Sequence, residues 1–200
     1  CSAHKFSSGS HAEGRIAGKA ACKFLVDNPG DVNFDASKFE EVKAEILKPL
    51  KTYEEGKGYA VTDDITPNYI RPKMFLFRLN KIMDEYAGGT SSWYTTNKPM
   101  LDRALEELRM LYEDSKFLGA DGLHELMRAW ENYHRLWTSE AHVRHLMFRE
   151  ETRYPGYYYR ADFEEVLDQE NWHVFTISKW DPATREWSIR KEPVQNWLGL

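Results

Sequence analysis

The sequence predicts a mainly α-helical chain with a small β component, in which a three-helix bundle is followed by a β-hairpin. Three stretches within residues 71–153 carry apolar side chains at spacings of three and four, which is typical of amphipathic helices. Residues 172–191 instead alternate in the manner of strands on either side of a turn. With 200 residues, of which 42% are apolar, the chain is long enough to bury a core.

The three helices have start and stop signals of their own. Pro72 suits the first turn of a helix, and Gly88-Gly89 ends the first pattern. Asn97 and Pro99 predict a cap and an early-turn proline for the second helix, and the third begins near Asp121. The expected core-facing residues are, helix by helix, Phe75, Leu79, Ile82, Met83 and Tyr86; Leu101, Ala104, Leu105, Leu108, Leu111 and Tyr112; Leu123, Leu126, Met127, Trp130, Tyr133, Leu136, Trp137, Ala141 and Leu146.

The segment after the third helix changes character. A Pro-Gly pair within residues 154–160 excludes a helix and predicts a loop. In the hairpin, Asp181-Pro-Ala-Thr supplies the turn. One predicted strand face carries Trp172, Val174, Thr176 and Ser178, and the returning strand carries Trp187, Ile189 and Lys191. Before the bundle, residues 39–50 predict one further short helix.

Composition and charge exclude several functional classes. A net charge of −5 without a basic run argues against a nucleic acid polymer as partner. No apolar stretch reaches the roughly 20 residues of a membrane helix. The two cysteines, Cys1 and Cys22, are too few for a disulfide framework, which favours a reducing cytoplasm. Because the chain opens on Cys-Ser-Ala-His without Met, we expect it to be part of a longer polypeptide.

The opening segment combines a loop of small residues with a helix start. Ser10 and Glu13 have the spacing of a capping box, which predicts a helix from about Ser10 to the Asp27-Asn-Pro-Gly stop. Successive Ser and Gly residues before a helix N-terminus can present backbone N–H groups to an anion or a flavin. A simple capped turn explains the same residues, and both interpretations stay open at this point.

Two further groups of residues are candidate sites. Arg149 and Arg153, with Arg160 after the tyrosines, could bind an anion, but Glu150, Glu151 and Asp162 are close enough in sequence to neutralise them. A buried ion-pair network that fixes helix to loop is therefore the favoured hypothesis. The histidines of the third helix, His124, His134, His142 and His145, lack a zinc motif, so we expect half-buried helix histidines and no metal site.

Two stretches of the sequence resemble a known flavoprotein family. The residues from Trp130 to Phe163, including Arg149-Glu-Glu-Thr-Arg153, are similar to the C-terminal part of dissimilatory adenylylsulfate reductase α subunits. The opening Ser2-Ala-His-Lys-Phe-Ser-Ser-Gly-Ser10 resembles the last flavin-contacting loop of the same family. With Glu170-Asn-Trp172, the chain also looks like the wider fumarate reductase and succinate dehydrogenase flavoprotein family.

The resemblance implies a domain plan and a set of cofactor contacts. Residues 1–30 would end an FAD-binding α/β domain with its last loop and helix, 31–70 would connect, 71–153 would form the helical bundle, and 154–200 the loop and hairpin. The cofactor-binding residues would be His4, Lys5, Phe6, Ser7, Ser8, Gly9 and Ser10. His4 and Lys5 are also the candidates for substrate contact, while the main FAD pocket and the other catalytic residues would lie upstream of Cys1.

The resemblance also implies an activity and a partner. The complete enzyme would interconvert adenosine 5′-phosphosulfate and AMP plus sulfite, with electrons supplied by a β subunit that carries two [4Fe–4S] clusters. Alone, this chain would be inactive. The alternative from the residues is a free-standing helical interaction domain that uses its C-terminal aromatic side chains to hold a partner.

Overall fold

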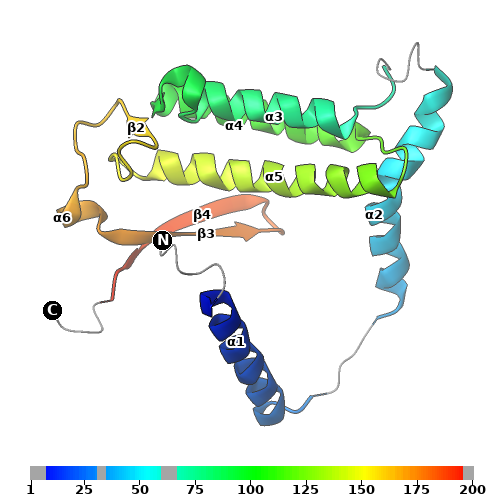
Figure 1. Cartoon of the computed structure of the whole chain (residues 1–200), viewed down its shortest axis with the longest axis horizontal. Helices are drawn as coiled ribbons and strands as arrows, with labels where there is room; N and C mark the ends of the chain where they lie inside the picture. Colours follow the sequence, from blue (N-terminus) through cyan, green and yellow to red (C-terminus); the bar gives the residue numbers. More distant parts are fainter. Residues whose placement is uncertain (1–7, 31–34, 60–66, 196–200) are drawn as a thin grey trace. The chain divides into compact units, whose positions relative to one another are not determined.

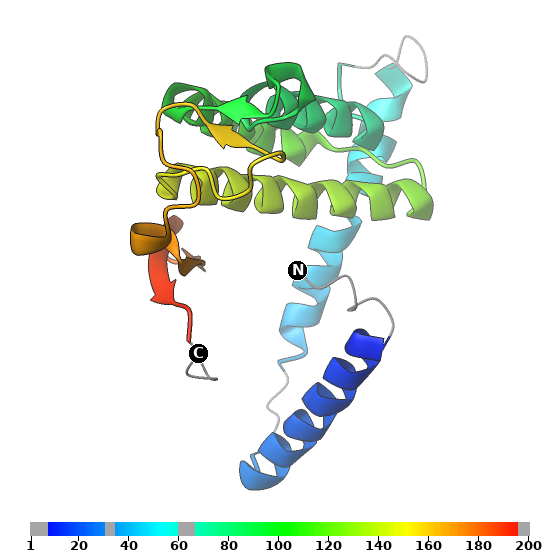
Figure 2. The same cartoon turned by 60° about the vertical axis from the view of Figure 1, so that its left-hand side comes forward.

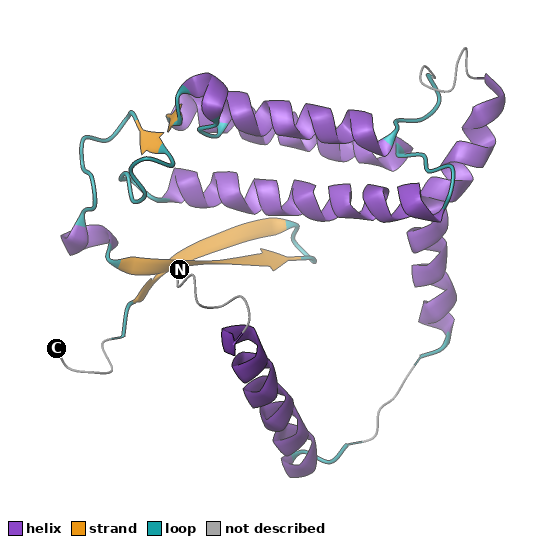
Figure 3. Ribbon diagram, viewed as in Figure 1, coloured by secondary structure: helices purple, strands orange, loops and turns teal. Residues whose placement is uncertain are grey.

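The computed structural model describes residues 8–30, 35–59 and 67–195 (Figure 1). The chain divides into two compact units, residues 1–42 and 43–200. The first unit contains α1 (Ser8–Asp27) and the start of α2 (Ser37–Gly56). The second contains the rest of α2 and all later elements, and helices dominate it (Figure 3).

The second unit is built on three long helices, as the sequence predicts. They are α3 (Pro72–Tyr86), α4 (Lys98–Asp114) and α5 (Leu123–Phe148), and they pack on one another (Figure 1). Asn97 caps α4 as expected, because its Oδ1 accepts a hydrogen bond of 3.0 Å from the backbone N–H of Met100. Gly88, at φ 82°, turns the chain after α3.

The core lies where the three helices meet. α3 contributes Phe75, Leu79 and Ile82, and α4 contributes four of the six residues of its predicted stripe. On α5 the prediction was partly wrong: Leu123, Met127 and Trp137 are 75, 52 and 49% exposed, and Tyr112 on α4 is 49% exposed. The buried residues of α5 are Leu126, Ala129, Asn132, Leu136, Val143 and Leu146.

The error on α5 arose from two neighbouring stripes that the sequence pattern merged. One stripe faces α3 and α4. The other carries Trp130, whose indole N–H donates a hydrogen bond of 2.9 Å to the carbonyl of Ile46 on α2. The backbone N–H of Ala120 also donates to the carbonyl of Pro49 at 2.9 Å. The second half of α2 therefore packs against the bundle near the start of α5.

The C-terminal hairpin consists of β3 (Val174–Asp181) and β4 (Glu186–Pro193), paired antiparallel with Trp180 opposite Trp187. The predicted turn is confirmed, since the backbone N–H of Arg185 donates to the carbonyl of Asp181 at 2.8 Å. Trp172 was wrongly placed in the strand, because it ends the short helix α6 (Gln169–Trp172). A two-stranded hairpin is marginal alone, and this one packs on α5.

The predicted loop 154–160 includes one short strand. β2 (Tyr159–Arg160) pairs in parallel with β1 (Thr95–Thr96), which precedes α4 (Figure 2). Three 3-10 turns complete the described elements, at Lys57–Tyr59, Thr90–Ser92 and Ser115–Phe117. The mainly α fold with a small hairpin is therefore confirmed.

None of the helices in the described part of the chain is both long and apolar enough to cross a membrane.

Candidate functional site

Only some of the residues predicted to bind the cofactor lie in the described part of the structure. Four lie outside the described residues: His4, Lys5, Phe6 and Ser7. The other three, Ser8, Gly9 and Ser10, form the start of α1. The helix thus begins two residues earlier than predicted, and Ser10 lies inside it, so its assignment as the capping residue was wrong.

The first turn of α1 has the chemistry that an anion or a carbonyl requires. The first backbone N–H groups of a helix have no intrahelical acceptor, and the helix dipole places partial positive charge there. Backbone N–H groups at the start of α1 are therefore available as hydrogen-bond donors.

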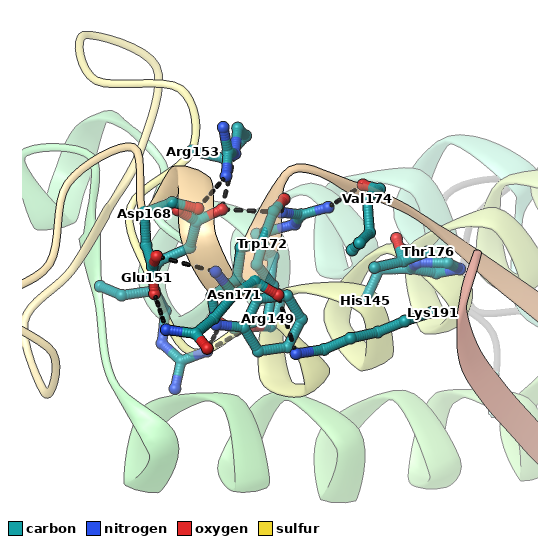
Figure 4. A network of polar contacts seen from close by, with 12 residues as sticks. His145, Arg149, Glu151, Arg153, Asp168, Asn171, Trp172, Val174, Thr176 and Lys191 are labelled. Carbon is teal, nitrogen blue, oxygen red and sulfur yellow. Dashed lines mark hydrogen bonds and ion pairs between the residues drawn. The ribbon is translucent and has the colours of Figure 1, made fainter. Parts of the chain in front are cut away.

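A second polar centre lies at the end of α5, and we call it the polar junction: Arg149, Glu151, Arg153, Arg160 and Asp162. The Glu151 side chain is 0% exposed, and its Oε1 accepts hydrogen bonds from Arg149 at 2.7 Å and from Arg153 at 2.6 Å (Figure 4). The two arginine side chains are only 12 and 14% exposed. The predicted ion-pair network is therefore confirmed for Glu151, whereas Glu150 is exposed.

Arg149 joins the end of α5 to the beginning of the hairpin. Its guanidinium donates to the carbonyls of Trp172 at 2.9 Å and Val174 at 3.0 Å (Figure 4). It also lies over the Trp172 ring at 5.3 Å, and Lys191 of β4 lies 3.4 Å from the centre of the same ring. Trp172, only 5% exposed, is thus held by two cations, each of which adds a cation–π attraction.

Arg160 closes the C-terminus of α5. Its guanidinium donates to the carbonyls of Leu146 and Arg149, the latter at 2.7 Å, where a helix leaves carbonyls without intrahelical donors. Asp162 pairs with Arg160 at 2.9 Å and also accepts from the backbone N–H of Lys98 at 2.8 Å. Burial raises the pKa of Asp162, but the hydrogen bonds from Arg160 and Lys98 outweigh it and leave that pKa below its usual value.

Of the four α5 histidines that were expected to be half-buried, only His145 is, because His124, His134 and His142 are exposed. His145 is half-buried, and its Nδ1 lies 2.8 Å from Thr176 Oγ1 on β3. Burial, followed by the nearby charge of Arg149, lowers the pKa of His145. Across residues 8–30, 35–59 and 67–195, no three His, Cys, Asp or Glu side chains gather closely enough to hold a metal ion.

Comparison with known proteins decides the family. Residues 78–197 match the family model described as the C-terminal part of the fumarate reductase flavoprotein. The chain belongs to this fumarate reductase flavoprotein family. The matched residues run from α3 through the polar junction to the end of the hairpin, so the junction is part of the family's C-terminal domain.

Within this flavoprotein family, the chain is similar to adenylylsulfate reductases. It is 50% identical over 192 residues to the adenylylsulfate reductase α subunit of Megalodesulfovibrio gigas, a match that covers 96% of this chain and 29% of that protein. It also matches the structure of adenylylsulfate reductase from the hyperthermophile Archaeoglobus fulgidus with a TM-score of 0.93 and 49% identity, over 98% of this chain and 30% of the other. The resemblance inferred from the sequence is thus confirmed.

Two further solved structures extend the comparison. An adenosine-5-phosphosulfate reductase in complex with sulfite, described as a covalent adduct, has the same TM-score of 0.93, 49% identity and 98% coverage of this chain. Mycobacterium smegmatis Sdh1 in complex with UQ1 is 16% identical with a TM-score of 0.64 over 90% of this chain, which shows a shared fold alone. The chain spans less than a third of the length of these relatives.

Sequence reasoning identified the charged residues of the polar junction but missed their partners. Trp172 and Lys191 were assigned to a strand pattern, and no local signal pairs them. The contact of Asp162 with the start of α4 joins residues 64 positions apart. Asn97 and Pro99 mark the start of α4 in the sequence, but they do not show which side chain reaches that helix end.

Proposed function

We propose that this chain forms the C-terminal part of an FAD-dependent reductase that interconverts adenosine 5′-phosphosulfate and AMP plus sulfite. The observation that carries the proposal is the match to adenylylsulfate reductase structures, at 49% identity and a TM-score of 0.93 over 98% of the chain. A match at 16% identity shows the fold alone, whereas identity near one half over almost the whole chain supports the same chemistry.

We assign the flavin edge to residues 4–10, with His4 and Lys5 as the candidates for substrate contact. The described end of this segment supports the assignment, because the first turn of α1 offers backbone donors and the positive end of a 20-residue helix. FAD would supply the two-electron chemistry when bound. The residues at the start of α1 would orient its ring edge and stabilise negative charge there, and the main pocket would belong to sequence upstream of Cys1.

The domain plan follows from the same proposal. Residues 1–30 would complete the FAD-binding domain, 31–70 would connect, 71–153 would form the helical domain, and 154–200 its loop and hairpin. The polar junction would then act structurally, because it holds the hairpin and the end of α5 together. The free-standing interaction domain is less well supported, because relatives that share this whole chain are reductases.

The proposed partner is a β subunit with two [4Fe–4S] clusters, which would pass electrons to the flavin. We place the enzyme in the cytoplasm, where an exposed free thiol such as Cys22 stays reduced. Substrates of the complete enzyme would be the adenylylated sulfate, AMP and sulfite.

The test joins this chain to an upstream FAD-binding portion of a relative. We expect flavin absorbance to be retained and an artificial acceptor to be reduced only when sulfite and AMP are both present. The upstream portion alone is the first control. Lys5→Ala should alter the flavin potential or the KM for AMP, whereas Lys19→Ala on the exposed surface of α1 should not. A joined protein that binds flavin but shows no sulfite-dependent and AMP-dependent reduction contradicts the proposal.

A further inference from the structure

A groove of about 400 Å³ lies between the start of α3 and the first half of α5. Its lining includes Lys73 and Phe77 from α3 and Arg128, Asn132 and Arg135 from α5. The polar junction lies at the opposite end of α5, so this groove is separate from it. Nothing in the proposed reductase chemistry uses these residues.

The groove carries an excess of positive charge. Its lining contains three cationic side chains and one anionic one, Glu125, in a chain whose net charge is −5. Glu125 faces Arg71 at 3.5 Å, and Arg71 also faces Asp121 at 3.7 Å, so this carboxylate is already engaged outside the lining. Even with Glu125 counted in full, one carboxylate against three cations leaves the lining with a net positive charge.

Two of these cations have no carboxylate partner in the described part of the chain. Lys73 lies 5.7 Å from the ring centre of Phe77, and the Nε of Arg128 donates to His124 at 3.1 Å. Arg135 differs, because it pairs with Glu131 at 3.2 Å. Lys73 is also the second residue of α3, where a cation opposes the helix dipole. Helix stability thus does not account for a lysine at this position.

The floor and wall of the groove are well defined. Asn132 is 1% exposed, and its amide donates to the carbonyl of Pro72 at 2.7 Å, which fixes α5 to the beginning of α3. Arg135 donates to the Asn132 oxygen at 3.3 Å. Phe77 is 54% exposed and gives the groove an apolar wall beside Lys73. Charged and apolar contacts are therefore available side by side on a rigid base.

We propose that this groove binds an acidic segment of a partner protein, with carboxylates at Lys73 and Arg128 and an apolar side chain against Phe77. A small anion fits less well, because Lys73, Phe77, Arg128 and Arg135 are all exposed and would leave such a ligand largely in water. An extended acidic segment reaches several cations at once, and complementary charge favours its association. The proposal does not depend on the reductase assignment.

The test uses the complete 200-residue chain and a fluorescein-labelled decapeptide of alternating Glu and Leu. We expect saturable binding by fluorescence anisotropy at low salt and at least tenfold weaker binding at 0.5 M salt, because salt screens exposed charges. The double variant Lys73→Glu with Arg128→Glu should bind at least tenfold more weakly. A glutamate at the second position of α3 suits the helix dipole, so this variant should fold, which a circular dichroism melt verifies.

The matched control is the double variant Lys179→Glu with Arg109→Glu, which makes the same change of net charge. Both residues are exposed, Lys179 on β3 and Arg109 on α4. It should bind within twofold of the unaltered chain, and Phe77→Ala should bind more weakly. Equal losses in both double variants would overturn the proposal, because binding would then follow net charge alone. Absence of saturable binding, equal binding of a Gln-Leu peptide, or complete competition by millimolar phosphate would each overturn it as well.

Discussion

Replacing Glu151 by glutamine removes the charge at the centre of the polar junction and keeps the shape of the side chain. Oε1 of Glu151 accepts hydrogen bonds of 2.7 and 2.6 Å from Arg149 and Arg153, and its Oε2 is buried without a partner among the described residues. In Glu151→Gln, the amide nitrogen takes the Oε2 position and brings two donors that find no acceptor. The substitution therefore weakens two ion pairs and adds unsatisfied donors.

The magnitude follows from the contacts. Hydrogen bonds to charged groups contribute roughly 1.5–3 kcal/mol each, which gives about 3–6 kcal/mol for the two. Arg149 keeps two carbonyl acceptors and Arg153 keeps the carbonyl of Asp168 at 2.9 Å, so neither guanidinium loses all its partners. We therefore expect the lower end, a loss of about 3 kcal/mol in the free energy of unfolding. For a chain of this length, that lowers Tm by roughly 6–12 °C.

The assay is thermal and urea unfolding followed by circular dichroism and by tryptophan fluorescence, because Trp172 lies at the junction. Glu150→Gln is the matched control: it removes the same charge from an exposed neighbour and should change stability by less than about 0.5 kcal/mol. If the two variants unfold together within that margin, the buried carboxylate does not hold the hairpin to α5, and the reasoning on the polar junction is refuted.

Three other substitutions test the fold at single positions. Asn97→Ala removes the side-chain cap of α4 and should cost about 1 kcal/mol in urea unfolding. Gly89→Ala places a Cβ 2.4 Å from the Cα of Asp84, so we expect a loss of about 1–3 kcal/mol and a lower Tm. The pKa of His145 is lowered in the fold, so the unfolded chain binds more protons, and stability should fall as pH drops below about 6.5. His145→Gln should flatten this loss between pH 7.5 and 5.5 in parallel melts.

Each of these has its own control. Met110→Ala, at an exposed position of α4, should leave the melt nearly unchanged where Asn97→Ala lowers it. Gly122→Ala meets no neighbour within 4 Å in the described structure and has no positive φ, so it isolates the clash at Gly89 from the general effect of an added methyl group. For the pH dependence, His124→Gln should keep the slope, and an unchanged slope in His145→Gln would show that other groups carry it.

The bounds of helices and turns were predictable where the residues that signal them lie next to them in the sequence. Asn97, Pro72 and the Asp181-Pro-Ala-Thr turn lie next to the elements they begin or end, and the structure has all three as expected. The burial of α5 was only partly predictable, because an amphipathic stripe does not say which of two neighbouring faces meets which helix. Asn132, a polar residue at the core, was missed because its acceptor on Pro72 is 60 positions away.

The difference between local and distant contacts also applies to the polar junction. Its charged residues could be identified from the sequence, whereas the contacts by which it connects α5 to the hairpin appear only in the structure. Charges within a few positions of one another, such as Arg149, Glu151 and Arg153, can be paired from sequence alone. Their other ligands are backbone carbonyls of Asp168, Trp172 and Val174, and a carbonyl has no sequence signature. A guanidinium whose acceptors are mostly carbonyls fixes the path of the backbone rather than the identity of a partner side chain. The junction can therefore keep its role while the residues between α5 and the hairpin vary, provided that Glu151 stays buried between the two arginines.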